Sequence, residues 1–557
     1  MPFNLIHEPW IPAVRGDGAV EYIPPWRISC PGGEGQGPFL ALAAPRPDFN
    51  GGLAQFLVGL LQTACPPADD FDWMDWLQSP PPPQKLKELL EPLAFAFNLD
   101  GDPPRFMQEP MDPAGVSHRP LGLLLIDQPK ENAVRKNQDL FVHQGQVAGL
   151  CPECLAAALF TMQTYSPVGG AGFFASLRGG GPLTTLVQAD EGATLWKNLW
   201  LNLLPVEQFR ALGDGKSRGL PEQFAWLRPA RPPKTAQQIV PSQAAAGLVF
   251  WSTPQRIWLD LENREPGPCS VCARESQALA AHYYIRQYGD KYQGWQHPLS
   301  PHYWKDGEPI ALKGQPAGVP YRDWLGVVAE APDEQAKRQP ARAVSHVRGL
   351  QSSFGFESLR DMRLSVWAFG YDVDKAKTRS WVDSRLPLLG VREEILPHYD
   401  RLARRLVAGA DLVRGLLVLN LKDAIFGSGA KAKTDGGALA QAAASFWTNS
   451  EGAFYDTLRG LKKALEDETA ANPEGEEEGV DPPAVVAILE TWLQTLNEIC
   501  LAIFDELADV DQLEWSNPKR VARARNKLAS SVNKHAKKIR EAMNLPLAPP
   551  KNQGAAA

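Results

Sequence analysis

The residues with the clearest capacity for chemistry are four cysteines in two C-x-x-C motifs, CPEC at 151–154 and CSVC at 269–272. Each motif is a short turn that presents two thiolates to one ion, and Zn²⁺ with four Cys ligands is the usual occupant of this pattern. The motifs lie far apart in the sequence, so a single ion would join distant segments and contribute to folding. A redox role is the alternative, but no thioredoxin-like pattern accompanies the motifs. We therefore predict a structural zinc site at Cys151, Cys154, Cys269 and Cys272.

Signatures of the common enzyme classes are absent from the sequence. There is no G-x-x-x-x-G-K-[ST] phosphate loop, no G-x-S-x-G elbow and no H-E-x-x-H motif. Asp372 and Asp374 have the right chemistry for Mg²⁺, but two carboxylates without a third ligand are more often a polar turn. A metal-dependent nuclease that uses Asp372 and Asp374 stays open as an alternative, as does a structural assembly subunit without DNA contacts. The leading expectation is a protein without catalytic residues.

The charge balance restricts where nucleic acid can bind. The 557 residues include 57 Lys and Arg against 64 Asp and Glu, for a formal net charge of −7. Eight of the acids lie between Glu466 and Asp481, a stretch without a base that is typical of a solvated loop. The rest of the chain is therefore nearly neutral, and a nucleic-acid interface would have to be a local feature.

The elements that must position these residues divide the chain in two. Proline-rich punctuation and short apolar runs predict a large mixed α/β body over residues 1–390, with a hairpin that turns at Gly16-Asp17-Gly18. Residues 391–545 carry helical patterns joined by breakers, which predicts an antiparallel four-helix bundle. The patterns cover 391–427, 437–468, 482–509 and 517–543. The fold class is thus α+β, and we expect residues 546–557 to be a disordered tail.

The fourth helical pattern is strongly basic. Its nine bases are Lys519, Arg520, Arg523, Arg525, Lys527, Lys534, Lys537, Lys538 and Arg540. This helix either follows a phosphate backbone or is a solvated face that the nearby acidic stretch balances. The N-terminus lacks the basic and apolar regions of a secretory signal, so we expect a soluble cytoplasmic protein that does not enter a membrane.

Several blocks of sequence, taken in order, resemble one family. They are NLIHEPWIP at 4–12, CPEC followed by LAAALF, GGAGF and SLRGGGPLTTLV, CSVC, QHPLSP at 296–301 and FGYDVDKAKTRSW at 369–381. Together they resemble the CasA family, whose members are the large subunit of the type I-E CRISPR surveillance complex, Cascade. The resemblance runs from residue 4 to about residue 390, and the C-terminal helical patterns are similar to the bundle of that family.

The resemblance implies a scaffold that is not an enzyme. Its partners would be the backbone and small subunits of Cascade, the 5′ handle of the CRISPR RNA and double-stranded target DNA. It would inspect the duplex for a short protospacer-adjacent motif, help to open it, and recruit a separate helicase-nuclease that cuts the DNA.

The resemblance also implies three DNA-contacting elements. The first is the loop 128–144, where Phe141 and His143 match an aromatic and a polar position of the family, the latter usually Asn. Lys130, Arg135 and Lys136 give this loop a charge that suits phosphates or the RNA handle. The alternative is a surface loop whose Phe141 packs inward.

The second element is a glycine loop and the third a wedge. The loop would meet the minor groove through Gly169, Gly170, Ala171 and Gly172, where Ala171 replaces a family glycine. A basic residue after the second cysteine motif would reach the same groove, with Arg286 preferred over Gln287 and Lys291.

The wedge has Lys375 at the tip, where the family has Gln, and Lys377 beside it. Tight packing of the glycines and a plain charged turn are the alternatives.

Overall fold

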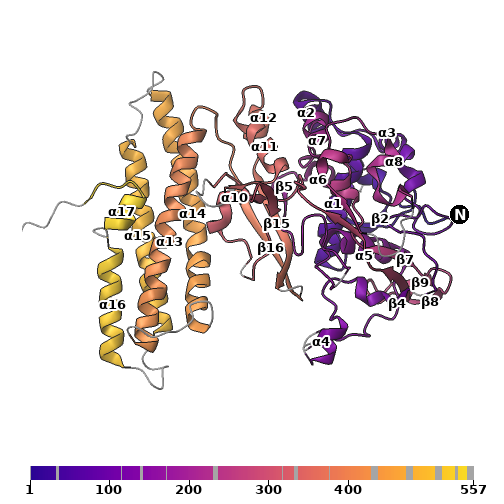
Figure 1. Ribbon diagram of the computed structural model, residues 1–557. Helices are drawn as coiled ribbons and strands as arrows, with labels where there is room; N and C mark the ends of the chain where they lie inside the picture. The colour runs from indigo at the N-terminus through magenta and orange to yellow at the C-terminus, as the bar shows by residue number, and fades with distance from the viewer. Residues whose placement is uncertain are drawn as a thin grey trace, which may run out of the picture. The chain divides into compact units, whose positions relative to one another are not determined.

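A computed structural model describes residues 2–547, apart from 33–36, 115, 138, 140–141, 171, 230–235, 317, 332–336, 375–376, 428–436, 472–480, 509–516 and 534–536 (Figure 1). The chain forms two compact units. The first unit comprises Met1–Gly318, Gly326–Leu350 and Met362–Leu388; the second comprises Val319–Leu325, Gln351–Asp361 and Leu389–Ala557.

The first unit is a mixed α/β structure built from several small sheets, in agreement with the predicted class. Its strands are β1 (Ile11–Arg15), β2 (Val20–Ile23), β3 (Phe39–Leu42), β4 (Ser117–Pro120), β5 (Thr184–Ala189), β6 (Gln237–Ile239), β7 (Arg256–Leu259), β8 (Glu265–Pro268), β9 (Glu275–Leu279), β10 (His282–Arg286), β11 (Asp290–Tyr292), β12 (His302–Lys305), β13 (Glu308–Ala311), β14 (Arg338–Gln339), β15 (Leu364–Asp374) and β16 (Lys377–Leu388). The predicted N-terminal hairpin is confirmed, because β1 and β2 pair antiparallel around Gly18, whose φ is +85°.

Helices of different lengths accompany these sheets. They are α1 (Pro47–Ala64), α2 (Asp70–Gln78), α3 (Pro83–Leu90), α4 (Glu131–Arg135), α5 (Pro152–Tyr165), α6 (Leu195–Trp200), α7 (Val206–Arg210), α8 (Leu220–Gln223), α9 (Leu248–Trp251), α10 (Trp324–Val327) and α11 (Arg342–Ser352). Helix α1 is buried on nearly all sides and packs against α5, α6 and β15. Aromatic rings around Phe56 of α1, among them Trp10, Phe160 and Trp251, form the centre of the core.

The sheet that carries the predicted wedge has the order β16-β15-β5. Strands β15 and β16 form a long antiparallel hairpin, and β5 pairs with β15 from Leu364 to Phe369. The residues just before β5 are the glycine-rich segment 168–182, so this segment and the hairpin extend from one sheet.

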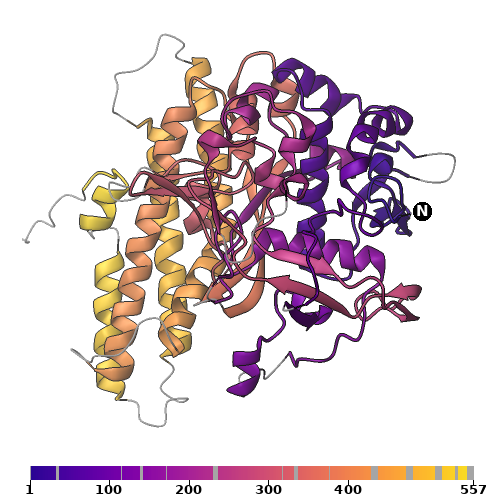
Figure 2. The same ribbon diagram turned by 45° about the vertical axis from the view of Figure 1, so that its right-hand side comes forward.

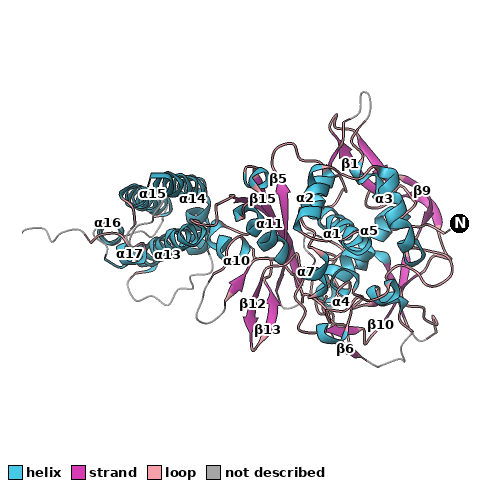
Figure 3. Cartoon of the chain, turned by 90° about the horizontal axis from the view of Figure 1, so that it is seen from above, coloured by secondary structure: helices cyan, strands magenta, loops and turns pink. Residues whose placement is uncertain are grey.

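The second unit contains long helices that lie side by side in two views (Figures 1 and 2) and are seen nearly end-on in Figure 3. They are α13 (Leu396–Phe426), α14 (Gly437–Ala471), α15 (Pro483–Leu507), α16 (Pro518–Val532) and the short α17 (Lys537–Ala542), and the unit also includes the single turn α12 (Glu357–Arg360). Helix α13 packs against α14, α15, α16 and α17, and α14 packs against α15. The first three helical patterns were placed correctly, whereas the fourth is two helices, since α16 ends at Val532.

The interpretation of residues 466–481 as a solvated loop is wrong at both ends. Helix α14 continues to Ala471, which places Glu466 on the helix. Asp481 is half-buried with a side chain only 5% exposed, and it bonds His398 and Arg405 of α13 and Asn544. The other acids of the stretch after Ala471 lie outside the described residues.

Helix α15 is long and apolar enough to cross a membrane by length and composition. Its buried residues recur at helical spacing, from Val485 and Leu489 through Trp492 and Leu496 to Ile503, and the helix packs against α13 and α14. We therefore interpret α15 as a core helix.

Candidate metal centre and nucleic-acid interface

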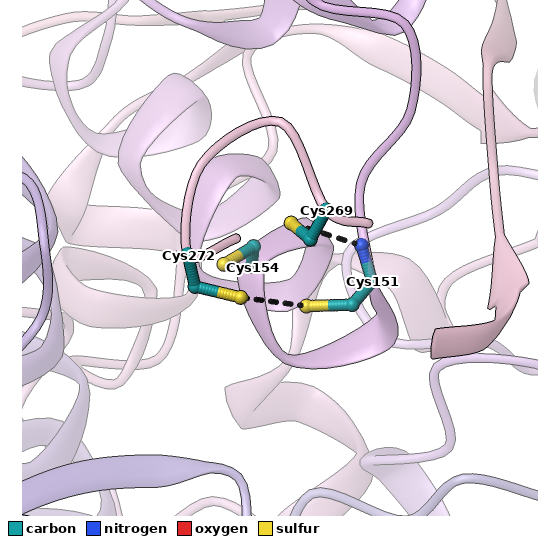
Figure 4. A group of neighbouring side chains, drawn as sticks. All are labelled: Cys151, Cys154, Cys269 and Cys272. Atoms are coloured by element: carbon teal, nitrogen blue, oxygen red, sulfur yellow. Dashed lines mark hydrogen bonds between the residues drawn. The ribbon is translucent and has the colours of Figure 1, made fainter. Parts of the chain in front are cut away.

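The four predicted cysteines come together in the first unit (Figure 4). The sulfurs of Cys151, Cys154, Cys269 and Cys272 all lie within 4.8 Å of one another, and they form a group that can hold a metal ion. Cys151 Sγ and Cys272 Sγ are 3.7 Å apart. A tetrahedral Zn²⁺ with Zn–S bonds of about 2.3 Å places its sulfurs about 3.8 Å apart. The cluster therefore has the spacing of a tetrahedral thiolate site.

The local structure explains why the cysteines meet. Cys151 stands directly before α5, and its backbone N–H donates to Cys269 Sγ at 3.4 Å. Leu150 forms a β-bridge with Ala280, which holds the two cysteine segments side by side. Hydrogen bonding to Cys151 and Cys269 raises the pKa of Cys154. A divalent cation among the four sulfurs would favour the thiolate forms instead.

A cavity of about 1050 Å³ in the first unit brings together parts of all three predicted DNA-contacting elements. Lys130 lines it from the loop before α5, Gly169 and Gly170 from the glycine-rich segment, and Lys377 from the hairpin. These residues are far apart in the sequence, and no local pattern joins them. The cavity is therefore the strongest candidate for a nucleic-acid interface.

The glycine turn at the cavity needs its glycines for conformation and for space. Gly169 N donates to Phe173 O at 3.2 Å, and Phe173 N donates to Gly170 O at 3.1 Å. A Cβ on Gly169 would lie 2.8 Å from Phe173 Cβ, and Gly170 has a φ of +118°. The backbone of this turn is consequently uncovered at its tip, where Gly169 and Gly170 are exposed.

The other side of the turn is fastened to the end of β10. Tyr288 N donates to Gly172 O at 2.7 Å, and a Cβ on Gly172 would lie 3.0 Å from Gln287 Cβ. Arg286, the last residue of β10, directly precedes this contact. Arg286 is thus placed beside the glycine turn, although it does not line the cavity.

The hairpin carries its own ion pair. Asp372 is buried, and both of its oxygens accept hydrogen bonds from Arg379, each at 2.7 Å. Asp374 is exposed and 4.0 Å from Arg379. The hydrogen bonds to Asp372 raise the pKa of Arg379, which remains a cation. Because Arg379 occupies both oxygens of Asp372, the pair is better suited to shaping the hairpin than to binding Mg²⁺.

A polar cluster at the base of the cavity was not predicted from the sequence. Tyr371 Oη donates to Asp48 at 2.6 Å, and Arg46 bonds both Asp48 at 2.9 Å and Asp127 at 3.0 Å. Burial raises the pKa of Tyr371, so its hydroxyl stays a donor. This cluster connects the hairpin to the start of α1 and to the loop that leads to Lys130. Its members carry no sequence signal, because Asp48 and Tyr371 are 323 residues apart.

The segment between the glycine turn and β5 is locked to the core by Arg178. This buried guanidinium donates to Gln55 Oε1 at 2.7 Å and to the hydroxyls of Thr184 and Ser300, each at 2.9 Å. Burial lowers the pKa of Arg178 to about 10, so the side chain is still charged at neutral pH. Neutral oxygens therefore solvate the charge and fix the segment to α1 and β5.

The remaining predicted residues lie elsewhere or are undescribed. Arg135, Lys136 and His143 are exposed around α4 but do not line the cavity, and His143 Nδ1 is 3.6 Å from Asp139. Three further predicted residues, Phe141, Ala171 and Lys375, lie outside the described residues.

The fold is that of CRISPR-associated proteins of known structure. A CasA structure from Thermus thermophilus matches with a TM-score of 0.65 at 18% identity, covering 95% of this chain and 100% of that one. Thermobifida fusca Cse1 matches with a TM-score of 0.67 at 18% identity, covering 98% of each chain. A chain of a CRISPR RNA-guided surveillance complex matches with a TM-score of 0.63 at 15% identity, covering 95% of this chain and 99% of that one.

The family model of CRISPR-associated protein Cse1 matches residues 4–503. The chain belongs to this family, for which CasA is the alternative name, and the resemblance inferred from the sequence is confirmed.

Proposed function

We propose that this chain is the large subunit of an RNA-guided CRISPR surveillance complex of the Cascade type. In this role it inspects double-stranded DNA for the protospacer-adjacent motif, helps to open the duplex, and recruits a helicase-nuclease without being an enzyme itself. The observation that carries the proposal is the cavity lined by Lys130, the glycine turn and Lys377. Family membership supports the same role.

The geometry suits duplex inspection. Gly169 and Gly170 offer exposed backbone without side chains, which allows close approach to base edges in a minor groove. Lys130 and Lys377 bring positive charge to the same cavity, where it would contact phosphates. Lys375 at the hairpin tip would enter the duplex, and Arg286, beside Gly172, would reach the same groove. Phe141, His143, Arg135 and Lys136 complete the proposed surface toward the DNA or the RNA handle.

We assign a structural Zn²⁺ to the four-cysteine cluster. When bound, the ion supplies four coordinate bonds that hold residues 149–154 to residues 269–280. Gly149 lies against Leu279 of β9, and Gly172 lies against Gln287, directly after β10, so the region after the second cysteine motif also supports the glycine turn. The role of the metal is thus to stabilise the surface that meets DNA.

We assign residues 391–545 a four-helix bundle that contacts the backbone and small subunits in the cytoplasm. Three of the basic residues of α16 have packing contacts rather than forming a free phosphate track. Arg520 donates to the carbonyls of Ala424 and Ile425 at the end of α13, and Arg525 pairs with Asp505 of α15. Lys527 pairs with Asp423. These three bases therefore have partners on α13 and α15.

Co-purification tests the assignment to a complex. The full chain, expressed in its own host with an affinity tag, should copurify with other CRISPR-associated subunits and with a short RNA whose 5′ end is a constant repeat sequence. Recovery of the chain alone, without RNA, would remove the basis for the proposal. Cleavage of DNA by the isolated chain with Mg²⁺, lost in Asp374→Ala, would favour the nuclease alternative.

A further inference from the structure

One face of the sheet β4-β10-β7 carries aromatic side chains that the proposed function does not use. In the register of this sheet, Tyr284 of β10 lies directly between His118 of β4 and Trp258 of β7. His282 lies two residues before Tyr284 on the same strand. Directly paired residues and residues two apart share a face, so all four side chains are on one side of the sheet.

Three of the rings form a stack. The His118 ring centroid is 4.6 Å from that of His282 and 4.6 Å from that of Tyr284, with interplanar angles of 27° and 26°. Among these described rings, His282 and Tyr284 do not contact each other, so His118 lies between them. His118 Nε2 is also 3.1 Å from Asp260 Oδ2, which fixes the central ring. The stack is therefore formed in advance of any ligand.

This face is open to solvent. His118 and His282 are exposed and Tyr284 and Trp258 are half-buried, whereas Tyr283, on the opposite face of β10, is buried in the core. Neither the His282 ring nor the Tyr284 hydroxyl hydrogen-bonds another described residue. An exposed ring at the end of a parallel stack presents a flat face to a planar ligand.

Two arginines lie near the rings, and the first of them also has the acids Asp100, Asp102 and Glu262 nearby. The Arg105 guanidinium lies 4.1 Å from the Trp258 ring centroid and donates to the carbonyl of Gly101. Arg286 is on the same face as Tyr284, two residues further along β10, and the next residue, Gln287, contacts Gly172. The aromatic face and the contact with the glycine turn thus belong to the same strand and the residues directly after it.

We propose that this face binds an unpaired base of single-stranded nucleic acid, which extends the ring stack at His282. Stacking between aromatic side chains and bases tolerates any sequence, and Arg286, on the same face of β10, is placed to meet a flanking phosphate. The inference rests on the proposed function in that an RNA-guided complex supplies two single strands, the guide RNA and the displaced DNA strand. Both offer the same chemistry to this face.

The test measures fluorescence anisotropy of labelled oligothymidylate and oligouridylate with the full chain at low salt. His282→Ala and Tyr284→Ala should each weaken binding roughly 5- to 100-fold, as expected for the loss of one stacking contact. His282→Phe keeps a ring and should retain most of the affinity. Trp304→Ala, which removes an exposed aromatic from the separate strand β12, is the matched control and should change nothing.

The outcomes separate this inference from the proposed function. Loss with either oligonucleotide supports the inference, and the more affected one identifies the natural strand. Unchanged binding in both alanine variants, an equal loss in Trp304→Ala, or no binding by the wild-type chain would overturn it. The inference would also be overturned if the alanine variants lost copurification with the other subunits but still bound the oligonucleotides, since the face would then be a protein interface. The assembled complex with His282→Ala should still bind motif-bearing duplex, whether or not this variant binds the single-stranded oligonucleotides.

Discussion

Asp481 connects three parts of the second unit through one carboxylate. It accepts hydrogen bonds from Arg405 at 2.6 Å, His398 at 3.1 Å and Asn544 at 3.1 Å. Burial alone would raise the pKa of this carboxyl, but these partners outweigh burial and lower it below the ordinary value of 3.8. The folded state therefore favours the ionised form.

This pKa shift predicts a pH-dependent contribution to stability. Because the folded pKa is lowered, the contribution is present above pH 3.8 and is lost as the pH falls through the folded pKa. Asp481→Asn should lower the free energy of unfolding by about 1–3 kcal/mol at pH 7, and the difference from wild type should shrink near pH 3. Denaturant unfolding of the full chain at pH 7 and pH 3 measures this difference in the free energy of unfolding.

Asp456→Asn, which breaks an exposed pair with Arg459, is the control and should have an effect below about 0.5 kcal/mol. Equal effects of both substitutions would contradict the role of Asp481.

At the scale of elements, the hairpin β15–β16 and the glycine segment are in backbone contact. A Cβ on Gly314 would lie 2.8 Å from Tyr371 O, and a Cβ on Gly181 would lie 2.6 Å from the same atom. Gly314 N also donates to Gly181 O at 3.2 Å. The hairpin and the glycine-rich segment that follows the glycine turn are therefore held together at residues without side chains.

Gly314→Ala should force this contact apart. Because the nearest atoms are backbone atoms that do not yield easily, we expect a loss of stability of about 1–3 kcal/mol, together with weaker duplex binding by the assembled complex. Gly349→Ala is the control, since a Cβ there meets nothing within 4 Å in the helix α11. It should be neutral or stabilise the protein by up to about 1 kcal/mol. The account of this contact fails if Gly314→Ala is as stable as wild type and binds duplex normally.

At the scale of the whole molecule, the cysteine cluster joins segments 118 residues apart along the chain. We expect purified protein to contain about one equivalent of zinc, and removal with a chelator to lower the melting temperature by several degrees. Cys151→Ser should reproduce this loss, whereas Cys500→Ser, outside the cluster, should leave the metal content unchanged. Metal analysis combined with thermal unfolding checks both. Less than half an equivalent of zinc with four reactive thiols would exclude the metal.

How much of this could be predicted from the sequence depends on how local each signal is. The cysteine cluster was predictable because each C-x-x-C pair is a complete local motif, and the long helices were predictable from their apolar spacing. The end of α16 at Val532 and the ion pairs of Asp481 were not predictable, since the helical pattern continues past Val532 and the partners of Asp481 lie on the distant helix α13. The polar cluster that lines the cavity could not be predicted either, because Arg46, Asp48 and Tyr371 meet only in the folded chain. The glycine turn was expected only from the family resemblance.

The most direct test of the central claim is duplex binding by the assembled complex with a matched guide RNA. Lys377→Ala is compared with Lys337→Ala, which removes an exposed lysine that pairs with Glu330 outside the cavity. We expect Lys377→Ala to weaken binding of motif-bearing duplex by about tenfold or more while binding of single-stranded target persists, because guide pairing alone holds that target. Equal binding of motif-bearing duplex by both variants would contradict the claim that this cavity reads double-stranded DNA.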